Sequence, residues 1–359
     1  MSFSETNRGD VYSQLARHLD NLPAGFPATE SGVELRILRR LFTSDEAMVA
    51  LGLHMKPEPA VKIAKRLQME AEALEIMLED MSRKGLIFRA RKGELALYMA
   101  TQFVVGIWEY HVNDLNEELI KDVNEYVPFL MEKTWAEMET KQLRVIPIAE
   151  SMPVEASVMP YEEAATIIES QSKIVVAPCI CRKEQKMMGE GCDSPMEACF
   201  IFGMAAYYYE ENGLGRSISQ EEAMGLMQKG LDAGLVLQPS NSQKSINICM
   251  CCGCCCQMLK NLKKMPHPAT MIDSNYFAVV ADENCIACGD CAERCHMDAI
   301  EIEDTAKVDL DRCIGCGVCV PVCDYDALHL EKKDEASLIV PPETMVQTYM
   351  KMAQERGKL

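Results

Sequence analysis

The chain has 359 residues, a formal net charge of −19 and 18 cysteines. This length is enough for two or three domains. The strong negative charge disfavours nucleic acid as the main partner and favours a redox partner protein with a basic docking face. The first thirty residues contain no apolar segment of the signal-peptide kind, and no stretch approaches the roughly eighteen apolar residues of a membrane span. We therefore expect the cysteines to be metal ligands in a reducing cytoplasm rather than the disulfides of a secreted scaffold.

The N-terminal part shows helical patterns that end in a hairpin. Residues 1–30 predict a short helix and a turn, and residues 31–100 predict three helices followed by two strands around Lys92-Gly93, which is the winged-helix pattern. The expected recognition helix is acidic, with Glu70, Glu72, Glu75, Glu79 and Asp80. Phosphate contact needs the opposite sign, so a protein-docking or structural role is favoured. A small basic group leaves a DNA-binding regulator open: Arg83, Lys84, Arg89, Arg91 and Lys92.

The middle of the chain predicts a change from helices to a mixed region. Residues 101–172 predict a helical connecting region with Trp108, Tyr110 and Trp135 as packing anchors. Residues 173–265 predict an α/β domain rich in cysteine, in which a strand leads into Cys179 and a helix covers 201–210. A linker is expected at 266–274, a cluster domain at 275–332 and a helical tail at 333–359. The fold class is therefore α+β.

Ten cysteines lie in the central domain. Cys179 and Cys181 end the strand in C-I-C-R, Cys192 and Cys199 follow, and the run I-C-M-C-C-G-C-C-C extends from Cys249 to Cys256. Adjacent residues on an extended strand point to opposite faces, so neighbouring cysteines of this run should face different sites. Gly253 would let the backbone turn tightly.

We assign at least one further metal cluster to this domain. Cys179, Cys181, Cys192 and Cys199 would form one side of its site, and the second run would close it with Cys251, Cys252, Cys254, Cys255 and Cys256. A zinc site or a structural-thiol site remains open as the alternative. Arg182, next to Cys181, would either offset cluster charge or form a surface ion pair.

The C-terminal part contains the pattern C-x2-C-x2-C-x3-C twice, at 285–295 and 313–323. Three cysteines spaced by two residues can surround three corners of a [4Fe–4S] cube, and the fourth cysteine reaches the other cube. Cluster I is therefore assigned to Cys285, Cys288, Cys291 and Cys323. Cluster II is assigned to Cys313, Cys316, Cys319 and Cys295. The segment between the runs predicts a small hairpin, and zinc on C-x2-C pairs is the alternative to the cubes.

These runs resemble bacterial-type two-cluster ferredoxins. One departure is that His296 and Asp324 follow the fourth cysteines, where the family usually has proline, and Pro321 lies inside the second run. The whole chain is also similar to a group of iron–sulfur proteins of anaerobes, in which a central C-x-C-R … C-C-x-C-C-C domain precedes the ferredoxin part and many members begin with a winged-helix-like segment. The residues that carry this similarity are Cys179, Cys181, Arg182, Cys192, Pro195, Glu197, Cys199, Gly203, Gly215, Arg216 and the run from Cys249 to Cys256.

The resemblance implies electron transfer by [4Fe–4S] clusters, to or within a larger anaerobic redox system. An alternative is an oxidoreductase whose central site reduces a disulfide, a corrinoid or another small acceptor. A second alternative is a redox-sensing winged-helix regulator. The sequence contains no glycine-rich dinucleotide or P-loop motif, and its six histidines are scattered. Catalytic residues therefore cannot be named from the sequence.

Overall fold

The computed structural model describes residues 11–152 and 158–358. Within this part the chain forms two compact units. The first comprises 11–139, 207–214 and 349–358, and the second comprises 140–152, 158–206 and 215–348. Helices α10 and α14 contribute residues to both units. Residues 1–10 of the predicted N-terminal segment and 153–157 of the predicted connecting region lie outside the described residues.

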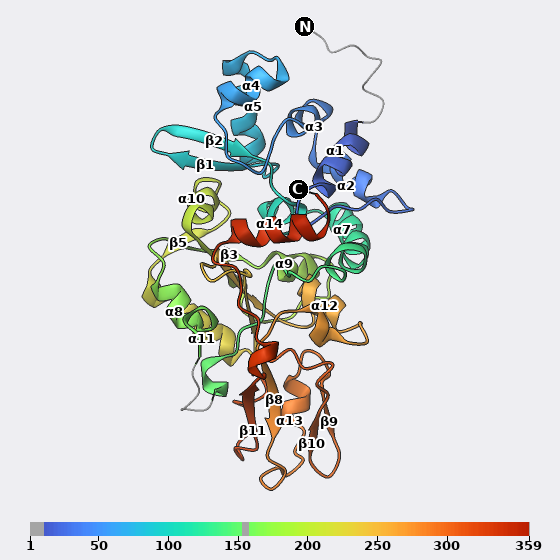
Figure 1. Ribbon diagram of the computed structural model, residues 1–359, viewed down its shortest axis with the longest axis vertical. Coiled ribbons are helices and arrows are strands. Elements are labelled where there is room, and N and C mark those ends of the chain that lie inside the picture. Colours follow the sequence, from blue (N-terminus) through green and yellow to red (C-terminus); the bar gives the residue numbers. More distant parts are fainter. Residues whose placement is uncertain (1–10, 153–157, 359) are drawn as a thin grey trace. The chain divides into compact units, whose positions relative to one another are not determined.

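The first unit is mainly helical (Figure 1). Its helices, with the two that are shared with the second unit, are α1 (Val11–Asp20), α2 (Val33–Leu41), α3 (Ser44–Ala50), α4 (Ala60–Leu67), α5 (Ala71–Arg83), α6 (Trp108–Tyr110), α7 (Glu117–Leu130), α10 (Gly203–Glu211) and α14 (Met345–Glu355). Local sequence explains several helix starts. Thr43 and Glu46 form a reciprocal capping box at α3, and the Asn116 side chain accepts from Leu119 N at α7. The expected anchors Trp108 and Trp135 are buried.

A two-stranded antiparallel hairpin follows α5, formed by β1 (Phe88–Lys92) and β2 (Leu95–Met99). An isolated antiparallel bridge joins Glu58 to Tyr98 beside it. The predicted hairpin is thus confirmed, but four helices, α2 to α5, precede it rather than the predicted three. The winged-helix interpretation stays a prediction.

Several members of the predicted basic group lie in this hairpin or at the end of α5, and they form ion pairs with acidic side chains. Arg89 is 3% exposed and lies 2.6 Å from both Glu79 and Glu211. Arg91 lies 2.9 Å from Glu211, and Lys84 lies 2.8 Å from Glu46. Basic side chains that already form ion pairs within the unit attract a phosphate backbone less strongly than free ones.

The second unit contains a five-stranded sheet in the order β5-β3-β4-β7-β6. Its strands are β3 (Ile174–Pro178), β4 (Glu197–Phe202), β5 (Arg216–Ile218), β6 (Val236–Pro239) and β7 (Asn247–Cys251). All the pairings between these strands are antiparallel, so the central domain is α+β rather than the predicted α/β. The helices of this domain are α8 (Ala164–Glu169), α9 (Ile180–Met187), α11 (Gln220–Asp232) and α12 (Gln257–Leu262).

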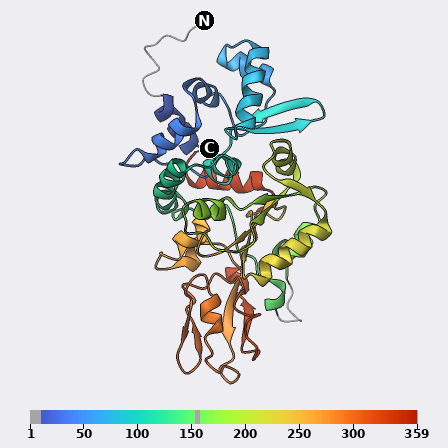
Figure 2. The same ribbon diagram turned by 180° about the vertical axis from the view of Figure 1, so that it is seen from behind.

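Helices α8 and α11 pack on each other, and α11 contacts strands β3 and β4 (Figure 2). The Ser219 side chain caps α11 by accepting from Glu222 N. The prediction of a helix from Ile201 was wrong by two residues, because Ile201 and Phe202 extend β4. Gly203, at φ 58°, then starts α10.

The C-terminal part of the second unit contains two two-stranded antiparallel sheets and one short α-helix (Figure 1). The elements are β8 (Tyr276–Val280) paired with β11 (Leu328–Lys332), β9 (Ile300–Ile302) paired with β10 (Ala306–Val308), and α13 (Asp290–Arg294). The predicted hairpin between the cysteine runs is therefore confirmed. A small core of Tyr276, Ala278, Ile300, Leu328 and Leu330 holds these elements together. Cys291 and Cys319 are buried within it.

Candidate iron–sulfur sites

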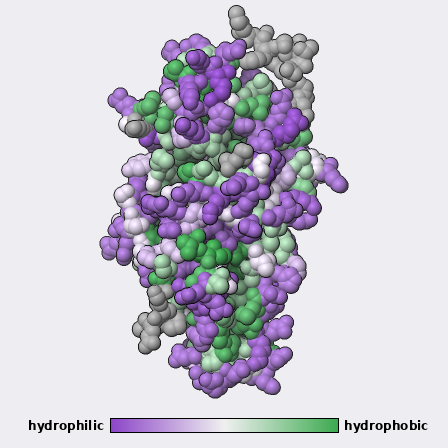
Figure 3. Space-filling view, viewed as in Figure 1, coloured by the Kyte–Doolittle hydropathy of each residue, from purple (hydrophilic) through white to green (hydrophobic). Residues whose placement is uncertain are grey.

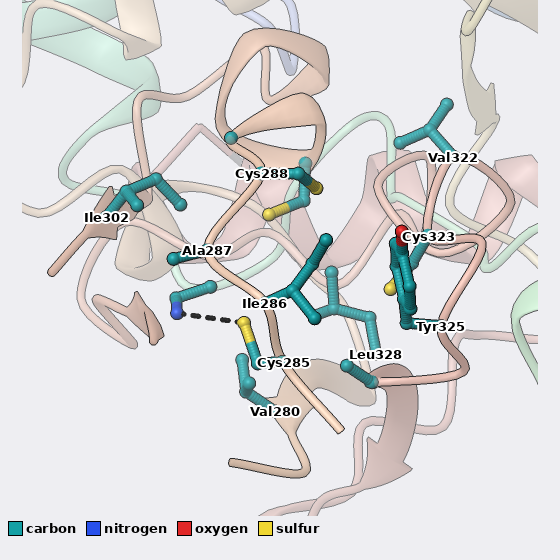
Figure 4. Close-up of a pocket in the computed structure, with 14 residues that line it drawn as sticks. Val280, Cys285, Ile286, Ala287, Cys288, Ile302, Val322, Cys323, Tyr325 and Leu328 are labelled. Carbon is teal, nitrogen blue, oxygen red and sulfur yellow. Dashed lines mark hydrogen bonds between the residues drawn. The ribbon is translucent and has the colours of Figure 1, made fainter. Parts of the chain in front are cut away.

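Two cavities lie in the C-terminal domain, and each is lined by four cysteines. We call the first cavity I; its cysteines are those expected to bind cluster I, namely Cys285, Cys288, Cys291 and Cys323. Figure 4 shows three of them around this cavity with Ile286 and Tyr325 beside them. We call the second cavity II; its cysteines are those expected to bind cluster II, namely Cys295, Cys313, Cys316 and Cys319. The fourth cysteine of each run thus lies at the cavity of the other run.

The surroundings of these thiols fit iron–sulfur clusters. Both cavities are lined mainly by apolar side chains. Backbone amides donate to the sulfur atoms, with Ala306 N 3.3 Å from Cys285 Sγ (Figure 4) and Ala299 N 3.3 Å from Cys295 Sγ. Thiolates that accept amide hydrogen bonds in an apolar environment are the usual setting of ferredoxin clusters, and these bonds help to set the potential. When bound, such clusters supply one-electron transfer.

The two cavities differ in exposure. Cys288 of cavity I is exposed. At cavity II, burial raises the pKa of Cys316 to about 12 and also raises the pKa of Cys313 and Cys319. Segments from outside the cysteine runs cover cavity II, since Ile148 N donates to Cys316 O at 3.2 Å. Cavity II is therefore the more enclosed of the two.

A pair of equivalent backbone positions reflects the same difference. Gly315 follows Cys313 by two residues with φ 65°, and Ala287 follows Cys285 by two residues with φ 56°. A Cβ on Gly315 would overlap the carbonyl oxygen of Tyr276. Only glycine fits the enclosed position, whereas alanine is accommodated in the left-handed conformation at the open one.

The ten central cysteines fall into two groups in the structure. We call the first the six-thiol set, formed by Cys179, Cys181, Cys199, Cys249, Cys251 and Cys256. Cys256 interacts with Cys181 and Cys251, Cys181 with Cys179, and Cys249 with both Cys251 and Cys199. Sheet pairing produces part of this arrangement, because Cys199 on β4 lies opposite Cys249 on β7. Cys249 belongs to the run seen in the sequence but not to the predicted ligands.

We call the second group the four-thiol set, formed by Cys192, Cys252, Cys254 and Cys255, whose sulfur atoms all lie within 4.8 Å of one another. Cys192 was predicted to lie on the same side of one site as Cys179, Cys181 and Cys199. The structure instead brings Cys192 to the loop after β7. Adjacent cysteines do face different groups, since Cys251 belongs to the six-thiol set and Cys252 to the four-thiol set.

Gly253 serves close packing at this loop. A Cβ built on it would lie 2.9 Å from the Cβ of His296, the residue that follows Cys295 of cavity II. His296 Nε2 lies 2.7 Å from Gly234 O. The loop of the four-thiol set therefore packs directly against the cluster II ligand segment.

Arg182 lies buried between the two central groups. It is 0% exposed and donates to the carbonyl oxygens of Pro195 and Met250. Burial would lower its pKa, but the neighbouring thiols of Cys179 and Cys252 raise the pKa above its usual value. Of the two roles considered for Arg182, the surface ion pair was wrong, and the position fits an offset of negative charge on sulfur.

Other buried polar side chains surround the six-thiol set, and no sequence pattern indicated them. Gln238 Nε2 lies 3.9 Å from Cys256 Sγ, and Asn247 Nδ2 lies 3.6 Å from Cys249 Sγ. Glu184 is fully buried on α9 and accepts from Gln257, which follows Cys256. Burial raises the pKa of Glu184 to about 7, so this carboxyl group can hold a proton near neutral pH.

Residues 284–327 match the family model of the 4Fe-4S dicluster domain, and this range contains all eight cysteines of cavities I and II. The chain is therefore an iron–sulfur protein of the electron-transfer class, with [4Fe–4S] clusters in its C-terminal domain. The match covers this domain only. No curated protein and no solved structure matches the chain. No helix of the described residues is long and apolar enough to cross a membrane.

Proposed function

We propose that the chain carries single electrons from a redox partner through cluster I and cluster II to an iron–sulfur centre held by the six-thiol set. The partner would be a redox protein or a multi-subunit oxidoreductase complex in a reducing, anaerobic cytoplasm, where the thiols stay available to metal. The proposal rests on one observation: cavities I and II and the six-thiol set lie in the same unit, and His296, next to Cys295 of cavity II, packs on Gly253 in the loop between Cys251 and Cys256.

Cavity I is the entry point in this proposal. Cys288 is exposed there, and Ile286 and Tyr325 at the same cavity are 56% and 50% exposed. Figure 3 shows hydrophobic residues at the surface of the C-terminal domain among hydrophilic ones. An apolar contact beside an exposed cluster suits brief docking, and the net charge of −19 favours a partner with a basic rim.

Cluster II, at cavity II, is the intermediate electron carrier in this proposal. Cys295 is followed by His296, which packs on Gly253 of the central loop. Arg294 Nη2 donates to Asp232 O at 2.9 Å, and Arg312 Nη2 donates to Lys263 O at 2.8 Å, so both arginines tie the cluster II side to the central domain. These contacts support transfer from cluster II to the central centre, because electron transfer weakens steeply with distance.

The route can be tested by removing cluster II, the intermediate carrier. In full-length Cys319→Ser, cluster II should be lost while cluster I remains. A low-potential protein donor should then still reduce cluster I, and the central centre should stay oxidised on the time scale that reduces it in the native protein. Freeze-quench EPR measures both centres. An unchanged rate of reduction of the central centre in the variant would contradict the route.

A second candidate is an oxidoreductase that reduces a disulfide, a corrinoid or another small acceptor at the six-thiol set. Two observations favour it: a [4Fe–4S] cube uses four thiolates, so six leave two over, and the buried Glu184 carboxyl can supply a proton. Counting the cysteines that can be alkylated in the intact, metal-loaded protein tests this candidate. Two reactive thiols from the six-thiol set would support an enzyme, and none would weaken it.

Nucleic acid is not among the partners we propose. Arg89 and Arg91 are paired with Glu79 and Glu211, so these two arginines offer little free positive charge to a phosphate backbone. A duplex-shift assay at low salt tests the regulator alternative, and binding there would restore it.

A further inference from the structure

The four-thiol set is supplied by two loops. Cys192 lies between α9 and β4, and Cys252, Cys254 and Cys255 lie between β7 and α12. The sulfur of Cys192 is 3.7 Å from that of Cys252 and 3.6 Å from that of Cys255, and the sulfurs of Cys254 and Cys255 are 3.7 Å apart. Among the described residues, this is the one group of three or more cysteine, histidine or carboxylate ligands close enough to share a metal ion.

These separations correspond to one ion rather than to a cube. Four thiolates at 2.3 Å from a tetrahedral ion lie about 3.8 Å from one another. Thiolates that bind a cube attach to four different irons, so the cube itself holds them further apart. The eight thiols of cavities I and II line their cavities without forming a group as tight as the four-thiol set.

We propose that Cys192, Cys252, Cys254 and Cys255 bind a single tetrahedral metal ion, separate from the iron–sulfur centres. Four thiolates form a soft, closed ligand set of the kind that selects Zn²⁺ or a mononuclear iron. Because protein sulfur fills all four positions, the ion has a structural role. The buried guanidinium of Arg182, beside Cys252, offsets the excess negative charge of four thiolates on one divalent ion.

The position of the ion gives it a defined task. It cross-links the α9–β4 loop and the β7–α12 loop. Both loops are adjacent to members of the six-thiol set: Cys199 follows the first loop, and Cys251 and Cys256 flank the second. A single ion at this place holds the two sides of the central centre in register. Cys254 is exposed, so the ion can enter from solvent.

Metal analysis of the anaerobically purified full-length protein tests the proposal. We expect about one zinc per chain, or one iron without matching sulfide, and X-ray absorption at that metal edge should show four sulfur neighbours at about 2.3 Å. Full-length Cys192→Ser should lose that one ion and keep its acid-labile sulfide. Cys249→Ser is the matched control, because it alters the six-thiol set and should keep the single ion.

Two results would overturn the proposal. One is loss of iron and sulfide together, in the proportions of a cube, from Cys192→Ser. The other is an absorption spectrum of the native protein without a four-sulfur mononuclear site, a measurement that decides the question even where the variant fails to fold. A mononuclear iron and a zinc ion are distinguished by the edge at which the four-sulfur shell is found. None of these outcomes bears on clusters I and II.

Discussion

The C-terminal and central domains surround their sulfur atoms in different ways. In the C-terminal domain the thiols lie among apolar side chains and accept hydrogen bonds from backbone amides such as Ala306 N. In the central domain the thiols have buried polar neighbours, including Arg182, Glu184 and Gln238. Burying polar and charged groups is costly unless they are compensated. Their presence around one set of thiols fits a centre at which a proton moves together with the electron, whereas the clusters of the ferredoxin part need only gain and lose an electron.

The largest expected effect comes from exchanging the two equivalent positions in the ferredoxin part. Gly315→Ala should destroy cluster II, with a loss of about four irons, because the new Cβ would overlap Tyr276 O. Ala287→Gly, the reciprocal change at cavity I, should keep all the iron. Iron and sulfide analysis measures both variants. Full iron content in Gly315→Ala would refute the enclosed geometry of cavity II.

In the central domain, Arg182→Met should lower the free energy of unfolding by about 3 kcal/mol, because it leaves buried negative charge without its partner. Arg216→Met is the matched control, since Arg216 is exposed and pairs with Glu197 and Glu222 on the surface. It should cause no measurable change. Anaerobic thermal unfolding of both variants measures the difference. Equal melting temperatures of Arg182→Met and Arg216→Met would contradict the role of Arg182 in offsetting negative charge.

Glu184 predicts a pH effect confined to the central domain. Its pKa is about 7 in the folded protein and 4.5 in the unfolded chain, so the folded state binds more protons between these values. Stability should therefore fall as the pH rises from about 4.5 to about 7, by up to about 3 kcal/mol, and stay level above that range. Glu184→Gln, which cannot ionise, should lack this fall. The melting temperatures of the native protein and of Glu184→Gln at pH 5.5 and pH 8 test this. An equal change of melting temperature between the two pH values in both proteins would contradict it.

The smallest effect is expected at the open edge of cavity I. Ile286→Ser should slow reduction of cluster I by a reduced bacterial two-cluster ferredoxin several-fold, because it removes apolar docking surface, and should change stability by less than about 0.5 kcal/mol. Leu310→Ser is the control, since Leu310 is equally exposed outside the lining of cavity I. Reduction by a small viologen should not change in either variant. Equal rates of reduction of the two variants by the protein donor would show that the donor does not dock at Ile286.

The regular spacing of the C-terminal cysteines made that domain predictable from the sequence. C-x2-C-x2-C-x3-C encodes both a tight loop and the exchange of the fourth ligand, and the two cavities contain the predicted groups of cysteines. The ligand assignments themselves stay predictions. The left-handed φ of Ala287 was not predictable, because an alanine gives no signal for that conformation.

The central domain was less predictable, because its thiol groups depend on strand register. Opposition of Cys199 and Cys249 requires β4 to pair with β7, and separation of Cys192 from Cys199 requires its loop to reach the Cys252–Cys255 turn. Local sequence encodes neither contact. Only the alternation of Cys251 and Cys252 follows from strand geometry alone. The burial of Glu184 could not be predicted for the same reason, because the sequence pattern of a helix does not show which segments pack on its polar face.

In the proposed route, electrons pass through two cubes into a third iron–sulfur centre of the same chain. Mössbauer spectroscopy with iron and sulfide counts on the anaerobically purified full-length protein tests it most directly. We predict about eight irons in two [4Fe–4S] clusters, together with a further iron–sulfur component that becomes reduced after them. A colourless protein whose eight C-terminal thiols hold zinc or are paired as disulfides would contradict the account.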